Sequence, residues 1–452
     1  MLHDAIHQQP VQDQRPLAAE MRTRLTQFLR PVLTRLAEKI DLRLVQTARD
    51  LVQAILTHRH RAMGLLLSEL GGYLLGPAQA PAGTKRISNL IHAKGWSADA
   101  INTVLWKAAS ERVQTLAAAG EEVLAVWDGS VWEKPESQAS ADWCPVRSAK
   151  ARRLARRRKG ISLPHKGPPI LVPGLHWDGI VVVGMQGAPT LAHLEWWTTR
   201  GEHATTQRAL EQRLLDRCAV TWGQNVRHVW DRGYAGSPWV QAAIAAKVRF
   251  IVRWKKGNKL LDSWGEARKA WEIARGKRAQ GYRMLRDPRT KQLLKVGVVV
   301  LPVTLLDHAQ PLWLVVARLG KGREPWYLLT NEPIRTLSDA WAIVLAYARR
   351  WQIEEVWRAS KSELAFESPR VQDWDVRLKL LLLACLAYAF LLHLLDCSFD
   401  ELRAVLLRNW CHRTGKRYQT VAMPLYRLRA ALSRLWQAAA PPGYHGPMLN
   451  SG

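Results

Sequence analysis

The first quarter of the sequence has the apolar spacing of helices. From Leu17 to about Ala119, hydrophobic residues recur every three or four positions, which is the spacing of one helix face. The stretch from Gly76 to Gly83 is rich in proline, glycine and alanine, so it predicts a break between two helical parts.

At Glu122 the pattern changes to that of strands. A short apolar run begins at Val123 and ends at Trp127, and two longer runs, 170–183 and 191–199, also have strand composition. Helices and strands then alternate, which is typical of an α/β domain. The predicted elements are a helix over 205–220, a strand over 226–230, a helix over 237–246 and a strand over 250–253.

Between 255 and 325 the composition shifts to lysine and arginine with interleaved tryptophan, and two strand-like runs follow at 296–301 and 312–316. These features predict a β-rich insertion. A short strand is predicted over 326–330 and a long helix over 338–364, and the helical pattern continues to about Ala438.

The charge of the chain indicates a polyanionic partner. Lysine and arginine number 66 against 38 acidic residues, which gives a formal net charge of +28 and a pI near 10.4. Nucleic acid is the leading interpretation, and a ribosomal or membrane-surface protein is the alternative. The segment 147–166 carries nine basic and no acidic residues, so we expect a solvated arm that grips phosphates. Lys85 and Arg86 begin a basic amphipathic element that suits either a DNA backbone or a solvated helix end.

The cysteines and the apolar runs favour a reducing cytoplasm and no membrane partner. The five cysteines are scattered without a CxxC pair, which predicts neither a disulfide framework nor a zinc ribbon. Cys411 and His412 lack a second ligand pair, so we expect a buried thiol there. We expect no signal peptide, and the run Leu380–Leu392 is too short to span a bilayer, so it predicts a buried helix.

Two aspartates stand at the carboxyl ends of predicted strands, in Asp128-Gly129 and in Asp231-Arg232-Gly233. Open α/β sheets bind their ligands at this edge, and two converging carboxylates make a site for a hard cation. Aspartate and glycine after a strand are also common in turns, which is the alternative interpretation.

The long helix around Glu354 carries a more specific pattern. Tyr347, Arg350, Glu354 and Lys361 are separated by 3, 4 and 7 residues, and at 3.6 residues per turn they fall within a stripe of about 60°. One helix face therefore combines a carboxylate for Mg²⁺ with two cations and a phenol for phosphate oxygens. A solvated face with an ordinary Arg350–Glu354 pair is the alternative.

The arrangement Tyr347-x2-Arg350-x3-Glu354-x6-Lys361 resembles the YREK signature of the insertion-sequence family-four (IS-four) transposases. Asp231-Arg232-Gly233-Tyr234 resembles their second-aspartate motif, and Asp128 matches the first aspartate in order and strand context. In motif order the similarity covers roughly 122–363.

The resemblance implies an RNase H-like catalytic core interrupted by the β-rich insertion, with helical regions at both ends. The implied domains are a DNA-binding region over 1–119, a core over 120–254 and 336–396, an insertion over 255–335 and a C-terminal helical region over 397–452 that pairs two protomers. Asp128, Asp231 and Glu354 are then expected to bind Mg²⁺, for which Mn²⁺ can substitute, and to be catalytic.

The resemblance also implies contacts with double-stranded DNA, both the terminal inverted repeats of the element and its target. Tyr347, Arg350 and Lys361 are expected to bind the strand, and Arg232 and Tyr234 to contact DNA or orient the second carboxylate. Trp326 resembles an insertion tryptophan that stacks on a flipped base in relatives that cut through a hairpin; a core tryptophan is the alternative.

The expected function is therefore cut-and-paste DNA transposition by a homodimer in a bacterial cytoplasm, at the nucleoid. An RNase H-like nuclease or resolvase has the same metal site but performs no strand transfer. A non-catalytic DNA-binding protein derived from a transposase is the third possibility. A strand-transfer assay with paired element ends separates the three.

Overall fold

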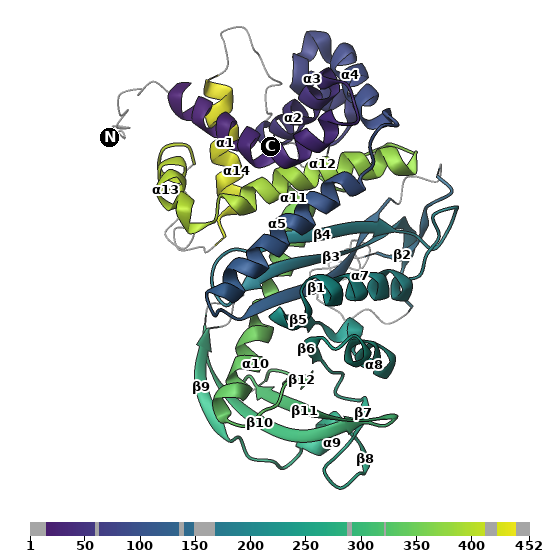
Figure 1. The fold of residues 1–452 in the computed structure, drawn as a ribbon, viewed down its shortest axis with the longest axis vertical. Helices are drawn as coiled ribbons and strands as arrows, with labels where there is room; N and C mark the ends of the chain where they lie inside the picture. The colour runs from purple at the N-terminus through teal and green to yellow at the C-terminus, as the bar shows by residue number, and fades with distance from the viewer. Residues whose placement is uncertain are drawn as a thin grey trace, which may run out of the picture. The chain divides into compact units, whose positions relative to one another are not determined.

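A computed structural model describes residues 15–58, 63–134, 140–148, 168–286, 292–320, 322–411 and 423–439. Apart from Arg147 and Ser148, the predicted basic arm at 147–166 lies outside these residues, as does His412. The chain divides into two compact units, one made of Met1–Val104 with Arg358–Gly452 and one of Leu105–Trp357 (Figure 1).

The unit formed by the two ends of the chain is helical in its described residues. Its apolar helix α12 (Trp374–His393) is long and apolar enough to cross a membrane, but 89% of the window that passes this test is buried inside the protein. This burial is typical of a core helix. The other helices are α1 (Arg15–Ala37), α2 (Leu42–Thr57), α3 (Leu67–Leu75), α4 (Ala80–His92), α13 (Asp400–Asn409) and α14 (Leu425–Ala438).

The predicted break at 76–83 is shorter than expected. A 3-10 turn occupies only Pro77–Gln79, and α4 begins at Ala80. Pro81 lies in the first turn of α4, where its missing N–H costs no hydrogen bond. Within α4, Arg86 binds Asp50 at 3.2 Å and Thr47 at 2.8 Å, so this predicted phosphate contact is already engaged inside the unit.

The second unit is mixed α/β and is built on one large mixed sheet, as the sequence predicted for the fold class. The strand order is β2-β3-β1-β5-β6-β12-β11-β10-β7-β8, with β4 paired to β3 and β9 to β10. The strands are β1 (Val123–Glu133), β2 (Cys144–Arg147), β3 (Leu171–Gly184), β4 (Thr190–Trp197), β5 (Val226–Trp230), β6 (Arg249–Arg253), β7 (Lys259–Leu261), β8 (Ala267–Lys269), β9 (Gly281–Arg286), β10 (Leu293–Leu305), β11 (His308–Arg318) and β12 (Trp326–Thr330).

The pairing directions divide this sheet into two parts. Strands β1, β5 and β6 are parallel, and β3 runs antiparallel to β1. Helices α7 (Gln207–Thr221) and α8 (Ser237–Ala245) share a core with Trp127 and Trp230 of this part. Strands β2 and β4 pair antiparallel with β3. Strands β7 to β12 are antiparallel to their neighbours, and β12 joins them to β6. The strands of the expected insertion therefore continue the same sheet.

Two boundaries differ from the sequence prediction. Strand β1 does not end before Asp128 but continues to Glu133, because β3 pairs with it along its whole length. The single helix predicted over 338–364 is two helices, α10 (Leu337–Arg349) and α11 (Trp351–Glu363), separated at Arg350. Two further α-helices are described. Helix α5 (Asp99–Ala118) spans the division between the two units, and the short helix α9 (Ala270–Ala274) belongs to the second unit.

An ion-pair network fastens β12 to the parallel strands. Glu122 precedes β1 and Glu332 follows β12, and each binds both Arg227 of β5 and Arg249 of β6. The separations are between 2.5 and 3.2 Å, and the Arg227 side chain is only 6% exposed. Two positive and two negative charges thus balance each other in a partly buried place, where an unpaired charge is costly.

We predict that Glu332→Gln lowers the free energy of unfolding by on the order of 3 kcal/mol, because it leaves buried arginines with one carboxylate fewer. Chemical denaturation at pH 7 measures this loss. Glu111→Gln is the matched control, since Glu111 forms an exposed pair with Lys107 at 4.0 Å, and its loss should stay within about 0.5 kcal/mol. Equal losses for both variants would contradict a stabilising network.

Candidate active site

Asp128 lies in β1 just past the end of its pairing with β5. The last parallel pair joins Val126 to Val229, and Asp128 is opposite Gly179 of β3. Trp127 belongs to the core shared with α7 and α8, and successive strand residues point to opposite faces. Asp128 therefore projects to the other face, where its side chain is 18% exposed.

Asp231 follows the last residue of β5, which places it at the carboxyl end of the neighbouring parallel strand. Its Oδ1 accepts a hydrogen bond of 2.6 Å from the Gly233 backbone N–H and caps the short 3-10 turn Arg232–Tyr234. This bond fixes one carboxylate oxygen at the edge of the sheet.

Glu354 lies in the first turn of α11 and comes to the site with Arg350. The guanidinium of Arg350 donates a hydrogen bond to Glu354, and its Nη1 lies 3.9 Å from Asp128 Oδ2. Arg350 is 12% exposed and Glu354 is 29% exposed. One cation therefore joins a carboxylate of the sheet to a carboxylate of the helix.

The charges of the three carboxylates reach one another. Burial raises the pKa of Asp128 to about 7; the Arg350 guanidinium opposes this rise, whereas the negative charges of Asp231 and Glu354 add to it. Like charges raise a carboxyl pKa in this way only when they are close. Three acids separated by long stretches of sequence therefore share one electrostatic environment.

The donor set suits a hard divalent cation, because carboxylate oxygens are the ligands that Mg²⁺ prefers. A divalent ion would also relieve the repulsion that raises the pKa of Asp128. As the side chains are placed here, no three His, Cys, Asp or Glu residues in the described part of the chain are close enough to hold a metal ion. Arg350 supplies the positive charge between two of the acids instead.

Gly179 brings α11 against the sheet beside Asp128. A Cβ on Gly179 would lie 2.3 Å from the Trp357 ring, so only glycine leaves room for that ring. Trp357 also packs on Trp177, with ring centroids 5.1 Å apart. Because Trp357 is one turn beyond Glu354, this contact fixes the height of the glutamate over the strand.

The sequence contains a signal for this arrangement that its first interpretation missed. Trp-Asp-Gly occurs twice, at 127–129 and at 177–179, and the two triplets pair antiparallel, with Asp128 opposite Gly179 and Gly129 opposite Asp178. Asp178 is 4% exposed and accepts a hydrogen bond from Trp197. Burial raises the pKa of Asp178 to about 6. Unlike Asp128, Asp178 therefore belongs to the core.

Tyr347 and Trp326 lie together near the carboxylates. Their ring centroids are 5.1 Å apart in an edge-to-face arrangement, and the Arg350 guanidinium lies 5.9 Å from the Tyr347 ring centroid. Burial raises the pKa of Tyr347, while Arg350 and Arg253 oppose the rise. Tyr347 is 4% exposed, whereas Trp326 is half-buried.

The other predicted residues occupy three different environments. Arg232 is 52% exposed and forms an ion pair with Glu324. Tyr234 is 5% exposed and packs on Trp230 and Trp239, so its side chain has a core position. Lys361 falls in the other unit, where its Nζ lies 3.9 Å from Glu367.

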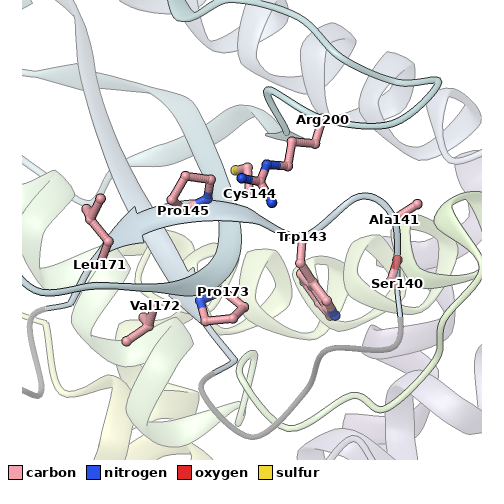
Figure 2. Close-up of a pocket in the computed structure, with 9 residues that line it drawn as sticks. All are labelled: Ser140, Ala141, Trp143, Cys144, Pro145, Leu171, Val172, Pro173 and Arg200. Carbon is pink, nitrogen blue, oxygen red and sulfur yellow. The ribbon is translucent and has the colours of Figure 1, made fainter.

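One pocket of this unit lies away from the three carboxylates. It has a volume of about 340 Å³ and lies at the β2 edge of the sheet (Figure 2). The three carboxylates do not contribute to its lining, which consists of Ser140, Ala141, Trp143, Cys144, Pro145, Leu171, Val172, Pro173 and Arg200.

We predict that Asp128→Asn stabilises the metal-free protein at high pH but not at low pH. A carboxyl whose pKa is raised to about 7 in the folded state makes folding less favourable as pH rises from about 4 to 7. The amide has no such charge, so the melting temperature in EDTA should exceed that of the wild type by about 2 to 4 °C at pH 8 and equal it at pH 4. A difference independent of pH would contradict the electrostatic environment described above.

Part of this unit and of the C-terminal helices resembles a known family. Residues 180–390 match the family model of the transposase DDE domain, a segment that contains Asp231 and Glu354 and begins after Asp128. Among solved structures, a piggyBac transposase synaptic complex with hairpin DNA is similar at a TM-score of 0.41 and 11% identity, over 96% of this chain and 83% of that one. This TM-score and identity are too low to assign a fold or a function to the chain. The match over 180–390, which includes two of the three grouped carboxylates, supports a transposase of the DDE class.

Proposed function

We propose that this protein is a cut-and-paste transposase of an insertion sequence of the IS-four type, which hydrolyses DNA phosphodiesters and transfers the freed strand. The observation that carries the proposal is that the Arg350 guanidinium lies between Asp128 and Glu354, while the charge of Asp231 also acts on Asp128. The match of 180–390 to a transposase DDE domain adds support, as does the net charge of +28.

An RNase H-like core is the fold proposed for the catalytic part. It is supported by three adjacent parallel strands, β1, β5 and β6, with β3 antiparallel on the outer side of β1. This arrangement sets Asp128 and Asp231 side by side at one edge, while α11 delivers Glu354 from above the sheet.

Asp128, Asp231 and Glu354 are the proposed ligands of Mg²⁺, for which Mn²⁺ can substitute. When bound, two such ions supply Lewis acids for the attacking water or 3′-hydroxyl and for the leaving oxygen of an in-line displacement. Asp128 must be deprotonated to serve as a ligand, so metal binding would release its proton near pH 7.

Arg350 changes partners in this mechanism. Its guanidinium lies between Asp128 and Glu354, and it would turn to the non-bridging oxygens of the scissile phosphate when the acids bind metal. Tyr347 packs beside Arg350 and limits the directions in which the guanidinium can move. Lys361 is proposed to bind the same strand, on the basis of the signature.

The proposed partners are double-stranded DNA, as element ends and as target, and a second copy of the chain. The helices of the other unit are proposed to recognise the ends, in a bacterial cytoplasm and without a membrane partner. A nuclease or resolvase with the same acids would cut the ends without joining them to a target. A non-catalytic derivative would bind the ends and do neither.

We predict that Asp231→Asn abolishes metal-dependent cleavage of a labelled element end but leaves DNA binding within about twofold. Loss of a direct ligand should cost more than the ~10- to 100-fold that loss of a second-shell partner costs, whereas one carboxylate contributes little to a basic binding surface. Gel-resolved cleavage and fluorescence anisotropy on the same DNA measure the two effects. Cleavage at wild-type rate would refute the assignment of Asp231.

Trp326→Ala tests the proposed stacking on a flipped base. If the enzyme uses a hairpin, loss of stacking worth about 1 to 3 kcal/mol should reduce hairpin formation roughly ten- to a hundredfold. First-strand nicking should persist because it needs only the metal site. Trp264→Ala is the control, since this insertion tryptophan is 69% exposed. Equal loss of both products with a depressed melting point would instead assign Trp326 to packing.

A further inference from the structure

Three cations converge on one exposed carboxylate next to the candidate active site. Glu324, in the loop before β12, is 3.2 Å from Arg232 and 3.3 Å from Lys256, and Arg253 lies 3.8 Å from the same carboxylate. Arg232 comes from the turn after β5, Arg253 from the end of β6 and Lys256 from the following turn. The chain therefore brings them together from separate segments.

The cluster adjoins the catalytic residues through short connections. Arg232 directly follows Asp231, and Glu324 is two residues before Trp326. Arg253 acts on the phenol of Tyr347, whose pKa burial raises and Arg350 and Arg253 lower. The same phenol also experiences the charge of Asp231, so the cations and the candidate active site share one neighbourhood.

The charge balance of this cluster differs from that of the network that stabilises the sheet. Glu122 and Glu332 match Arg227 and Arg249 two to two, in a partly buried place. Here one carboxylate faces three cations, and Lys256, Arg232 and Glu324 are 63%, 52% and 41% exposed. Arg253 is 20% exposed and also acts on Tyr347. The exposed pairs of Arg232 and Lys256 with Glu324 contribute little to stability, so stability does not account for these two cations.

We propose that Arg232, Arg253 and Lys256 form a binding site for a backbone phosphate of the DNA strand that enters the active site, and that Glu324 occupies this site in the free protein. A carboxylate and a phosphate offer these donors the same kind of acceptor oxygens. While Glu324 occupies the site, it lowers non-productive binding of anions. The incoming DNA phosphate then displaces it. This inference rests on the proposed function for its ligand.

Glu324→Gln tests the displacement. With the competing charge removed, an element-end duplex in EDTA should bind about fivefold more tightly, the size expected for one exposed ion pair. Glu266→Gln is the matched control, because Glu266 is also exposed and also bound to an arginine, Arg268. Unchanged or weaker binding by Glu324→Gln, with a melting curve like that of the wild type, overturns the proposal.

Lys256→Ala tests the phosphate contact itself. Loss of one contact should reduce the slope of log K against log salt by about 0.9 on duplex DNA. Lys277→Ala, which removes an exposed lysine that lies over the Trp264 ring, should leave the slope unchanged. An unchanged slope for Lys256→Ala overturns the site.

A third measurement separates DNA from free phosphate. Inorganic phosphate at matched ionic strength should displace DNA from the wild-type protein only weakly; binding of phosphate alone as tight as that of DNA would assign the site to a free anion. All these titrations are performed in EDTA and need no cleavage. They can therefore fail while Asp231→Asn still abolishes cleavage, or succeed in a protein that does not cleave.

Discussion

The unbalanced negative charge around Asp128 is the constraint on which the candidate active site depends. Burial raises the pKa of Asp128 to about 7, and the negative charges of Asp231 and Glu354 add to this rise. Such a group cannot persist in a folded protein without positive charge. Arg350 supplies it, and the break between α10 and α11 occurs at this residue.

The surrounding structure holds these opposed charges in place. Gly179 admits the Trp357 ring against β3, which sets α11 over the strand that carries Asp128. The buried network of Glu122, Glu332, Arg227 and Arg249 fixes β12 to β5 and β6. The site is therefore supported from its helix side by packing and from its sheet side by ion pairs, neither of which involves the three acids directly.

The sequence predicted the elements that have a regular local pattern. The bounds of β5 and β12 agree with the predicted strands, and those of α8 agree to within one residue, because apolar periodicity determines them. It did not predict where β1 ends, since that depends on pairing with β3, a partner 50 residues away. It also missed the interruption at Arg350, because the apolar period continues through it and the backbone stays helical there, while the local hydrogen bonds span three residues instead of four.

The candidate site residues follow the same distinction between local sequence pattern and tertiary packing. The three acids could be proposed because their strand and helix contexts are local, and the spacing of Arg350 and Glu354 on one helix face is that of a contacting pair, which the structure contains. The burial of Tyr234 was not visible, because it comes from Trp230 and Trp239 packing around it. The sequence shows the two Trp-Asp-Gly triplets only as a repeat. The structure adds that they pair antiparallel, which places Gly179 opposite Asp128.

The two unbalanced charge groups are complementary. The acidic group has three carboxylates and one guanidinium, and the neighbouring basic group has three cations and one carboxylate. Arg350 partly balances the acidic group, and Glu324 partly balances the basic one. A substrate that brings metal ions to the acids and phosphate to the cations would replace both internal partners at once. If the proposed function holds, metal and DNA together would therefore bind this edge more favourably than either one alone.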